Sequence, residues 1–201
     1  MKLFIKKKPI DYIIYSLIIV VGIIVDQISK WLIFSNMEIG QSIPIIKDVL
    51  HITYVTNDGA AFGMFDGPVE RLLVMIVTTI LVIGFSVYLY LGHAENIIYA
   101  VAMSLVVSGG IGNMIDRLGF GFYVNSETGM GEVIDFINFC AFPKIWNAIF
   151  NVADAFVCIG AGLLVLALVI DMINEAKGKK ADAQPAAEGA EQTSDEEEKA
   201  E

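Results

Sequence analysis

The chain has 201 residues, 56% of them hydrophobic, and its mean hydropathy is +0.66. Because an ordinary soluble domain contains roughly 45–50% apolar residues, this composition argues against a soluble protein and predicts one that uses lipid as part of its solvent. The formal net charge is −10, but residues 174–201 hold nine acids and four lysines and so carry half of the excess. The acidity therefore says little about a functional site.

Four stretches are long and apolar enough to cross a bilayer, which takes about 20 residues. In chain order they are 10–34, 72–91, 97–115 and 149–173, and we expect one compact all-α bundle of four transmembrane helices. Residues 1–8 carry four lysines, as the start of a signal peptide does. The apolar run that follows exceeds the usual length of about 7–15 residues and lacks a small-x-small cleavage site, so we predict a retained first helix.

Basic residues predict the topology. Lysines gather before the first helix and just after the fourth, and the positive-inside rule places both ends in the cytoplasm. Segments 35–71 and 116–148 are then outside, and the short turn 92–96 is inside. With about 1.5 Å of rise per helical residue, three polar clusters fall at the outer membrane boundary: Asp26 with Gln27 and Lys30, Asn113 with Asp116, and Asn151 with Asp154.

Carboxylates on three separate helices indicate a shared site. One at mid-bilayer costs about 2.5–3.5 kcal/mol, so such groups usually face a partner or a cavity. Each alone could instead mark a helix end, where the helix dipole would favour Asp154. Asn113 and Asp116, like Asn151 and Asp154, are three residues apart and share a helix face. We therefore expect each amide to hold its neighbouring carboxylate.

A further acid, Asp135, interrupts an apolar segment of the second outer loop. If Asp135 or Asp116 meets Asp154, the two carboxylates cannot both ionise cheaply and the pair holds one proton. Aspartic peptidases use this state: the ionised member takes a proton from the attacking water, and the protonated member hydrogen-bonds the scissile carbonyl. The residues alone rank Asp135 and Asp116 equally as the partner of Asp154. The scheme needs no metal and no cofactor.

Other readings are open but fit less well. Asp26 and Lys30 can form an ion pair whose simplest role is to pin the first helix at the interface. The sequence has no His-Glu-x-x-His, and His51 and His93 fall on opposite sides of the membrane. Ser29 points a different way round the helix from Lys30. A transporter would be expected to show mid-depth polar residues or an internal repeat, and a non-catalytic lipid-binding or assembly subunit would tolerate loss of either carboxylate.

Five short blocks follow in order between residues 25 and 159. They are Asp26-Gln-x-Ser-Lys30, Asn57-Asp-Gly-Ala-Ala-Phe-Gly63, Gly109-Gly-x-Gly-Asn-x-x-Asp-Arg117, Val133-Ile-Asp-Phe136 and Phe150-Asn-x-Ala-Asp154. Together they resemble the lipoprotein signal peptidases, also called type II signal peptidases. The resemblance implies a four-helix bundle with a small extracytoplasmic β-cradle. It also implies an aspartic endopeptidase that cuts diacylglyceryl-modified prolipoproteins just before the lipidated cysteine, at the outer face of the bacterial inner membrane.

By motif, the resemblance implies a catalytic pair of Asp135 and Asp154, and so selects Asp135 over Asp116. Supporting or substrate-binding positions fall on Asp26, Lys30, Asn57, Gly59, Asn113, Asp116, Arg117 and Asn151. The expected partners are prolipoproteins and membrane lipid, with no nucleic acid, metal or cofactor. Because the site would be complete within one chain, we expect a monomer.

The sequence also predicts the structure of two further segments, the connector after the third helix and the C-terminal tail. Residues 118–134 number 17 and include four glycines, where the family has a short connector, so we expect an extra hairpin or a flap over the cleft. Residues 174–201 lack an apolar period and are expected to form a disordered cytoplasmic tail outside a peptidase domain of residues 1–173.

Overall fold

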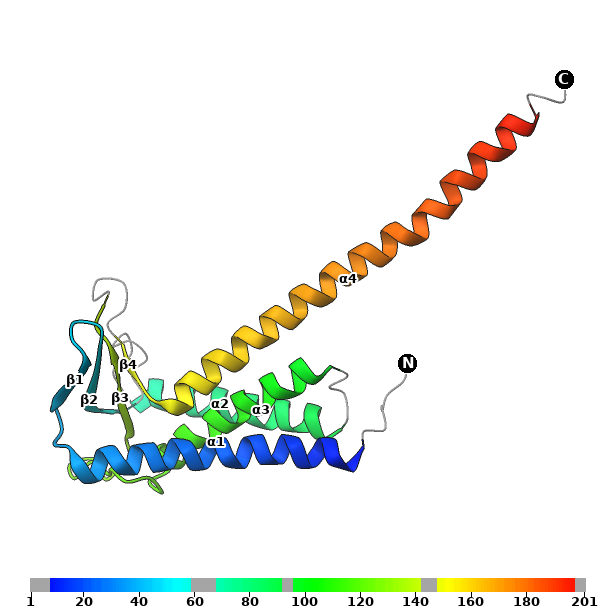
Figure 1. The fold of residues 1–201 in the computed structure, drawn as a ribbon. Helices are drawn as coiled ribbons and strands as arrows, with labels where there is room; N and C mark the ends of the chain where they lie inside the picture. Colours follow the sequence, from blue (N-terminus) through cyan, green and yellow to red (C-terminus); the bar gives the residue numbers. More distant parts are fainter. Residues whose placement is uncertain (1–7, 59–67, 92–95, 142–147, 198–201) are drawn as a thin grey trace. The chain divides into compact units, whose positions relative to one another are not determined.

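The computed structural model describes residues 8–58, 68–91, 96–141 and 148–197. In these ranges the elements are, in chain order (Figure 1), α1 (Pro9–Asn36), β1 (Ser42–Ile46), β2 (Leu50–Asn57), α2 (Pro68–Tyr90), α3 (Ile97–Arg117), β3 (Val133–Phe139), β4 (Ile149–Phe150) and α4 (Val152–Glu197). Each of these four helices holds a stretch long and apolar enough to span a membrane. The predicted fold class, four transmembrane helices with a small sheet, is confirmed.

Helix α3 is the inner helix. In its membrane-crossing stretch 61% of the residues are buried, against 22% in α1 and 6% in α2. A Cβ added to Gly109 would lie 2.2 Å from the backbone oxygen of Ala153 in α4, and one added to Gly112 would lie 2.6 Å from a carboxylate oxygen of Asp26 in α1. These glycines let α1 and the start of α4 approach α3 closely, as small residues do between membrane helices. Polar side chains from three helices can therefore meet.

The four strands form one antiparallel sheet in the order β1-β2-β3-β4. The sheet lies at the end of the helices where α1 finishes and α2 begins (Figure 1). Its buried core consists of Tyr54, Ile134 and Phe136, packed against Ile33 and Met37 from the end of α1. This contact fixes the sheet on α1.

Strand pairing brings distant polar residues to the helix ends. Asn57, at the end of β2, lies opposite Val133, two residues before Asp135 on β3. The other edge of β3 pairs with Ile149 and Phe150 of β4. The fourth helix, expected over 149–173, therefore begins three residues later than predicted, because this β-branched and aromatic pair extends the sheet.

The predicted end of the fourth helix also differs from the structure. Helix α4 continues past residue 173 to Glu197, although only its part Val152–Lys177 suits a membrane. The remainder is rich in alanine, glutamate and lysine, which favour a helix even without an apolar face. The expectation of a disordered tail thus departs from the structure as far as Glu197. The boundary between a peptidase domain of residues 1–173 and a tail stays a prediction.

The segment that follows α3 folds back on itself. Val124 and Gly131 pair as an isolated antiparallel bridge, and the backbone N–H of Asn125 donates to the oxygen of Met130 at 2.9 Å. The side-chain oxygen of Asn125 accepts two backbone N–H groups of the turn, at 2.9 and 3.2 Å. Gly129 supplies the left-handed backbone, with φ +66°. The segment therefore forms the predicted hairpin. That it is an addition to the family's fold and that it acts as a flap stay predictions.

Candidate active site

Asp135 and Asp154 are both bound by one residue, Asn151. Strand β3 carries Asp135, which is only 2% exposed, and the first turn of α4 carries Asp154. The side-chain Nδ2 of Asn151 donates to Asp135 Oδ1 at 2.7 Å, and its backbone N–H donates to Asp154 Oδ2 at 3.1 Å. The backbone N–H of Asp154 donates to Asn151 Oδ1 at 2.9 Å. Asn151 therefore caps α4 and links the two carboxylates.

Two more asparagines bind the remaining carboxylate oxygens. Asn57 Nδ2 donates to Asp135 Oδ2 at 2.9 Å, and Asn113 Nδ2 donates to Asp154 Oδ1 at 2.8 Å. Each of the four oxygens of the pair thus accepts one N–H from an asparagine. The expectation that Asn113 holds its own neighbour, Asp116, is wrong: its amide reaches across to α4 instead.

Lys30 explains this orientation of Asn113. The fully buried ammonium lies 2.8 Å from Asp26 Oδ2 and 2.6 Å from Asp116 Oδ2, and it donates to Asn113 Oδ1 at 2.9 Å. That same oxygen accepts from the asparagine that caps α4, at 3.0 Å. The amide nitrogen of Asn113 must therefore face the carboxylate on α4. The expected ion pair of Asp26 and Lys30 is present, and with Asp116 it joins α1 to α3 in the interior. A role in pinning α1 at the membrane surface stays a prediction.

Asp26 extends the same network to the backbone of α4. Its Oδ1 accepts from the backbone N–H of Ala153 at 2.9 Å. Gln27 Nε2 lies within hydrogen-bonding distance of Asp26 Oδ2, the backbone oxygen of Gly112 and Asp116 Oδ1, at 3.1, 3.2 and 3.3 Å. Gln27 was not predicted as a site residue, although its position next to Asp26 and one turn before Lys30 was the available signal. α1, α3 and α4 are therefore bound together directly beside the carboxylate pair.

Two arginines lie at the same end of the helices as the sheet: Arg71 is near the start of α2, and Arg117 is the last residue of α3. The Arg117 guanidinium interacts electrostatically with both Asp135 and Asp154, and its buried Nε has no hydrogen-bond partner in the part of the chain that the structure describes. Arg71 donates to the backbone oxygen of Arg117 at 3.0 Å and also to that of Gly131. Arg71 was not predicted as a site residue, because one basic residue before an apolar run usually only marks the membrane surface.

The electrostatics of Asp135 depart strongly from those of an exposed aspartate. Burial, and next the negative charge of Asp154, raise the pKa of Asp135 from its ordinary 3.8 to about 7. Hydrogen bonds from Asn57 and Asn151 and the charge of Lys30 oppose this rise, because they favour the ionised form. The Asp135 carboxyl therefore keeps its proton to a much higher pH than an exposed aspartate does.

The predicted site residues that the structure describes converge on this one place. They are Asp26, Lys30, Asn57, Asn113, Asp116, Arg117, Asp135, Asn151 and Asp154. Gly59 lies outside the described residues. Within the described ranges, no group of three or more histidine, cysteine, aspartate and glutamate side chains is arranged to hold a metal ion.

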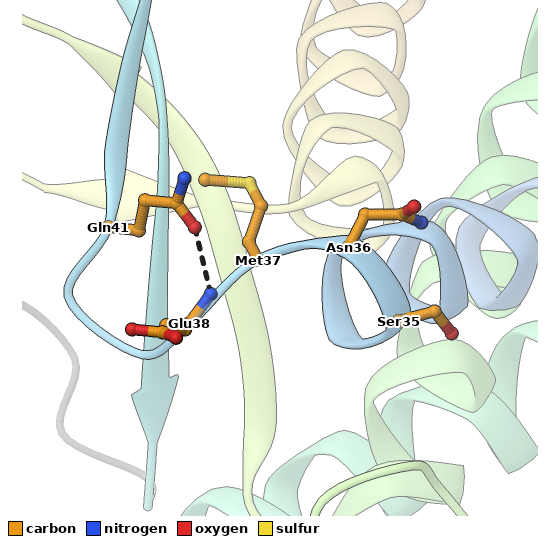
Figure 2. A pocket seen from close by; sticks show the side chains of 5 residues that line it. All are labelled: Ser35, Asn36, Met37, Glu38 and Gln41. Atoms are coloured by element: carbon orange, nitrogen blue, oxygen red, sulfur yellow. Dashed lines mark hydrogen bonds between the residues drawn. The ribbon is translucent and has the colours of Figure 1, made fainter.

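A separate hollow lies where α1 ends and leads into β1. It is lined by Ser35, Asn36, Met37, Glu38 and Gln41 (Figure 2). The backbone N–H of Glu38 donates to Gln41 Oε1 at 2.9 Å, which closes the turn. The hollow contains none of the predicted site residues, so we do not assign it to the active site.

Known proteins resemble this chain over most of its length, including the residues of the candidate site. The family model of signal peptidase (SPase) II matches residues 18–170. A lipoprotein signal peptidase of Halalkalibacterium halodurans is 40% identical over 167 residues, covering 83% of this chain and 97% of the relative. That of Bacillus subtilis is 36% identical over 158 residues, covering 79% and 94%. A bacterial membrane enzyme solved by the in meso method at 2.3 Å resolution matches with a TM-score of 0.67 and 37% identity, covering 80% of this chain and 90% of that one. With its four spanning helices, its sheet and this match over most of its length, the chain belongs to the signal peptidase II family and is a membrane peptidase.

Proposed function

We propose that this peptidase is an aspartic endopeptidase that removes the signal peptide from diacylglyceryl-modified prolipoproteins, cutting just before the lipidated cysteine. The relatives in Halalkalibacterium halodurans and Bacillus subtilis are lipoprotein signal peptidases, which supports the substrate class. The observation that carries the mechanism is the pair Asp135 and Asp154, both hydrogen-bonded to Asn151. The two acids are the proposed catalytic residues.

The electrostatics favour Asp135 as the protonated member of the pair, since its pKa is raised to about 7. Asp154, which is less buried, takes a proton from the water whose oxygen attacks the scissile carbonyl carbon. Asp135 gives its proton to the carbonyl oxygen of the tetrahedral intermediate. When the C–N bond breaks, Asp154 passes its proton to the leaving amine, and Asp135 regains one from the hydroxyl as the new carboxyl group forms. Both acids end in their starting states.

The supporting charges keep the pair at a single negative charge. Lys30 and Arg117 bring two formal positive charges, which balance the carboxylates of Asp26 and Asp116. The asparagines around the pair are neutral and do not titrate. Because other hydrogen bonds hold Asn113 and Asn151 in place, these two fix the carboxyl rotamers without adding charge, as preorganised catalytic groups require.

We place this site at the outer face of the bacterial inner membrane, with both termini in the cytoplasm. The lysine distribution supports this orientation. At the opposite ends of the helices, Tyr12 stacks on Tyr90 with ring centroids 6.1 Å apart, and the Tyr90 hydroxyl hydrogen-bonds Ser16 at 2.6 Å. Tyrosines commonly lie at the membrane surface. These would mark the cytoplasmic side.

This depth suits a lipidated substrate. The acyl chains can stay in the bilayer while the peptide reaches the polar site, and each buried CH₂ contributes about 0.8 kcal/mol to binding. Membrane lipid is therefore a partner in the proposal. A monomer suffices, because Asp135, Asp154 and the groups that hold them come from one chain.

The test uses the full-length protein in phospholipid vesicles with two precursors that differ only in the diacylglyceryl group. We expect cleavage before the cysteine for the lipidated precursor alone, and complete loss of cleavage in Asp135→Asn and Asp154→Asn. Asp171→Asn, at an exposed position, serves as the charge-matched control and should cleave normally. Circular dichroism should show unchanged helix content in all three. Equal processing of both precursors would reject the lipid requirement. Full activity of both Asp135→Asn and Asp154→Asn would reject the mechanism.

A further inference from the structure

We propose that the hairpin of residues 118–131 is an additional membrane-contacting element, whose apolar arms insert into the interfacial layer of the lipid leaflet where α1 and α3 end. The proposal adds a surface and a partner, the bilayer interface. It does not depend on the proposed cleavage reaction or on which side of the membrane the hairpin occupies.

Three contacts fix the depth of the hairpin. It continues directly from the membrane-spanning helix α3, and the backbone N–H of Leu118 still donates to Met114 at 3.0 Å. The ring of Phe122 packs against Phe34 near the end of the α1 span, with centroids 6.2 Å apart. Arg71, the first residue of the α2 span, donates to the backbone of the second arm. The arms therefore lie level with the ends of three spanning helices.

The chemistry of the hairpin changes along its length. The arms expose four large apolar side chains: Leu118 (53%), Phe120 (80%), Val124 (48%) and Met130 (46%). The turn between the arms, 125–128, is Asn-Ser-Glu-Thr, and Glu127 is the one charged residue in 118–131. An element with apolar arms and a polar tip suits the boundary between lipid and water, where aromatic residues are enriched.

Lipid is the occupant that the surroundings favour. The exposed apolar arms are continuous with α3, and the neighbouring helices α1 and α2 also expose large apolar side chains along their spans. Amphipathic elements at a membrane surface bury their apolar part about 5–10 Å into the boundary between headgroups and acyl chains. In that position the arms contact lipid and the turn at Glu127 stays in water.

Spin labelling of the full-length protein tests this directly. In a background of Cys140→Ser and Cys158→Ala, a nitroxide is attached at Phe120→Cys, in an arm, or at Glu127→Cys, in the turn. The protein is placed in vesicles of phosphatidylethanolamine and phosphatidylglycerol, and collision rates are measured with oxygen, which concentrates in lipid, and with a water-soluble nickel complex. A label at Ile80→Cys, 63% exposed within the α2 span, calibrates the response to lipid.

We expect the ratio of oxygen to nickel collisions at position 120 to approach that at position 80 and to exceed clearly that at position 127. A ratio at position 120 equal to that at position 127 would overturn the proposal, because the arm would then lie in water. The measurement involves no cleavage. A failure of the proposed peptidase mechanism and a failure of this inference would therefore show in different experiments.

Discussion

Replacing Lys30 by methionine removes the ammonium that Asp26 and Asp116 both contact, at 2.8 and 2.6 Å. The three side chains are 0–2% exposed, so water cannot take the place of the lost charge. Methionine keeps an unbranched apolar stem of similar length, so the substitution changes charge far more than packing. We expect a large loss of stability.

The size of the loss follows from two independent estimates. Removing one partner of a buried ion pair costs about 3–5 kcal/mol, because the other charge is left uncompensated. The carboxylates could instead take up a proton, which at pH 7 costs about 4 kcal/mol for an aspartate with an ordinary pKa near 3.9. We therefore expect the free energy of unfolding of Lys30→Met to fall by about 4 kcal/mol at pH 7.

The same reasoning gives a pH dependence with a definite sign. The folded variant binds a proton that its unfolded chain does not bind at pH 7, so lowering the pH favours the folded state. The difference from the parent protein should then shrink by about 1.4 kcal/mol for each pH unit between 7 and 5. A loss due to packing alone would not change with pH.

The assay is denaturant unfolding of the full-length protein in detergent micelles, followed by circular dichroism at pH 7 and pH 5. Lys47→Met, at an exposed position in the β1–β2 turn, is the matched control and should stay within about 0.5 kcal/mol of the parent. The double variant Lys30→Met with Asp116→Asn should be more stable than Lys30→Met, because one uncompensated charge is gone. A loss under about 1 kcal/mol for Lys30→Met, or one that does not change with pH, would refute the proposed charge balance.

Two further substitutions test the hydrogen bonds and the helix packing. Asn57→Ala removes a hydrogen bond that favours ionised Asp135, so the pKa of Asp135 should rise further. The alkaline limb of a plot of kcat/KM against pH should then move to higher pH. An unmoved limb would contradict the assignment of the catalytic proton to Asp135. Gly109→Ala places a Cβ 2.2 Å from the backbone oxygen of Ala153 and should destabilise the fold by roughly 1–3 kcal/mol, measured by thermal unfolding. Gly84→Ala, with open space around its added Cβ, should not destabilise, and equal losses for both glycines would contradict the close packing of α3 against α4.

The spanning helices could be predicted because hydropathy is a property of single segments. The α1 and α3 boundaries lie within two residues of the predictions, whereas the start of α4 was missed because Ile149 and Phe150 pair with β3. That pairing joins a short apolar dipeptide to a strand elsewhere in the chain. Its local sequence alone is equally compatible with a helix.

The residues that form the site could be predicted from the sequence, but the hydrogen bonds and ion pairs among them could not. Spacing places Asn113 and Asp116 on one helix face, yet it does not say what lies opposite that face. Lys30 from α1 binds both Asp116 and the side-chain oxygen of Asn113. The side-chain nitrogen of Asn113 therefore donates to Asp154 instead. Only the packing of α1 against α3 decides between these arrangements.

In the proposed mechanism Asp135 and Asp154 share one proton near neutral pH. Infrared difference spectroscopy of the full-length protein across a pH titration measures the carbonyl stretch of a protonated carboxyl group. We expect a buried carboxyl that titrates at about pH 7, is absent in Asp135→Asn, and titrates at lower pH in Asp154→Asn because the neighbouring negative charge is gone. An Asp135 that titrates near its ordinary pKa of about 3.9, and does so equally with and without Asp154, would contradict the account.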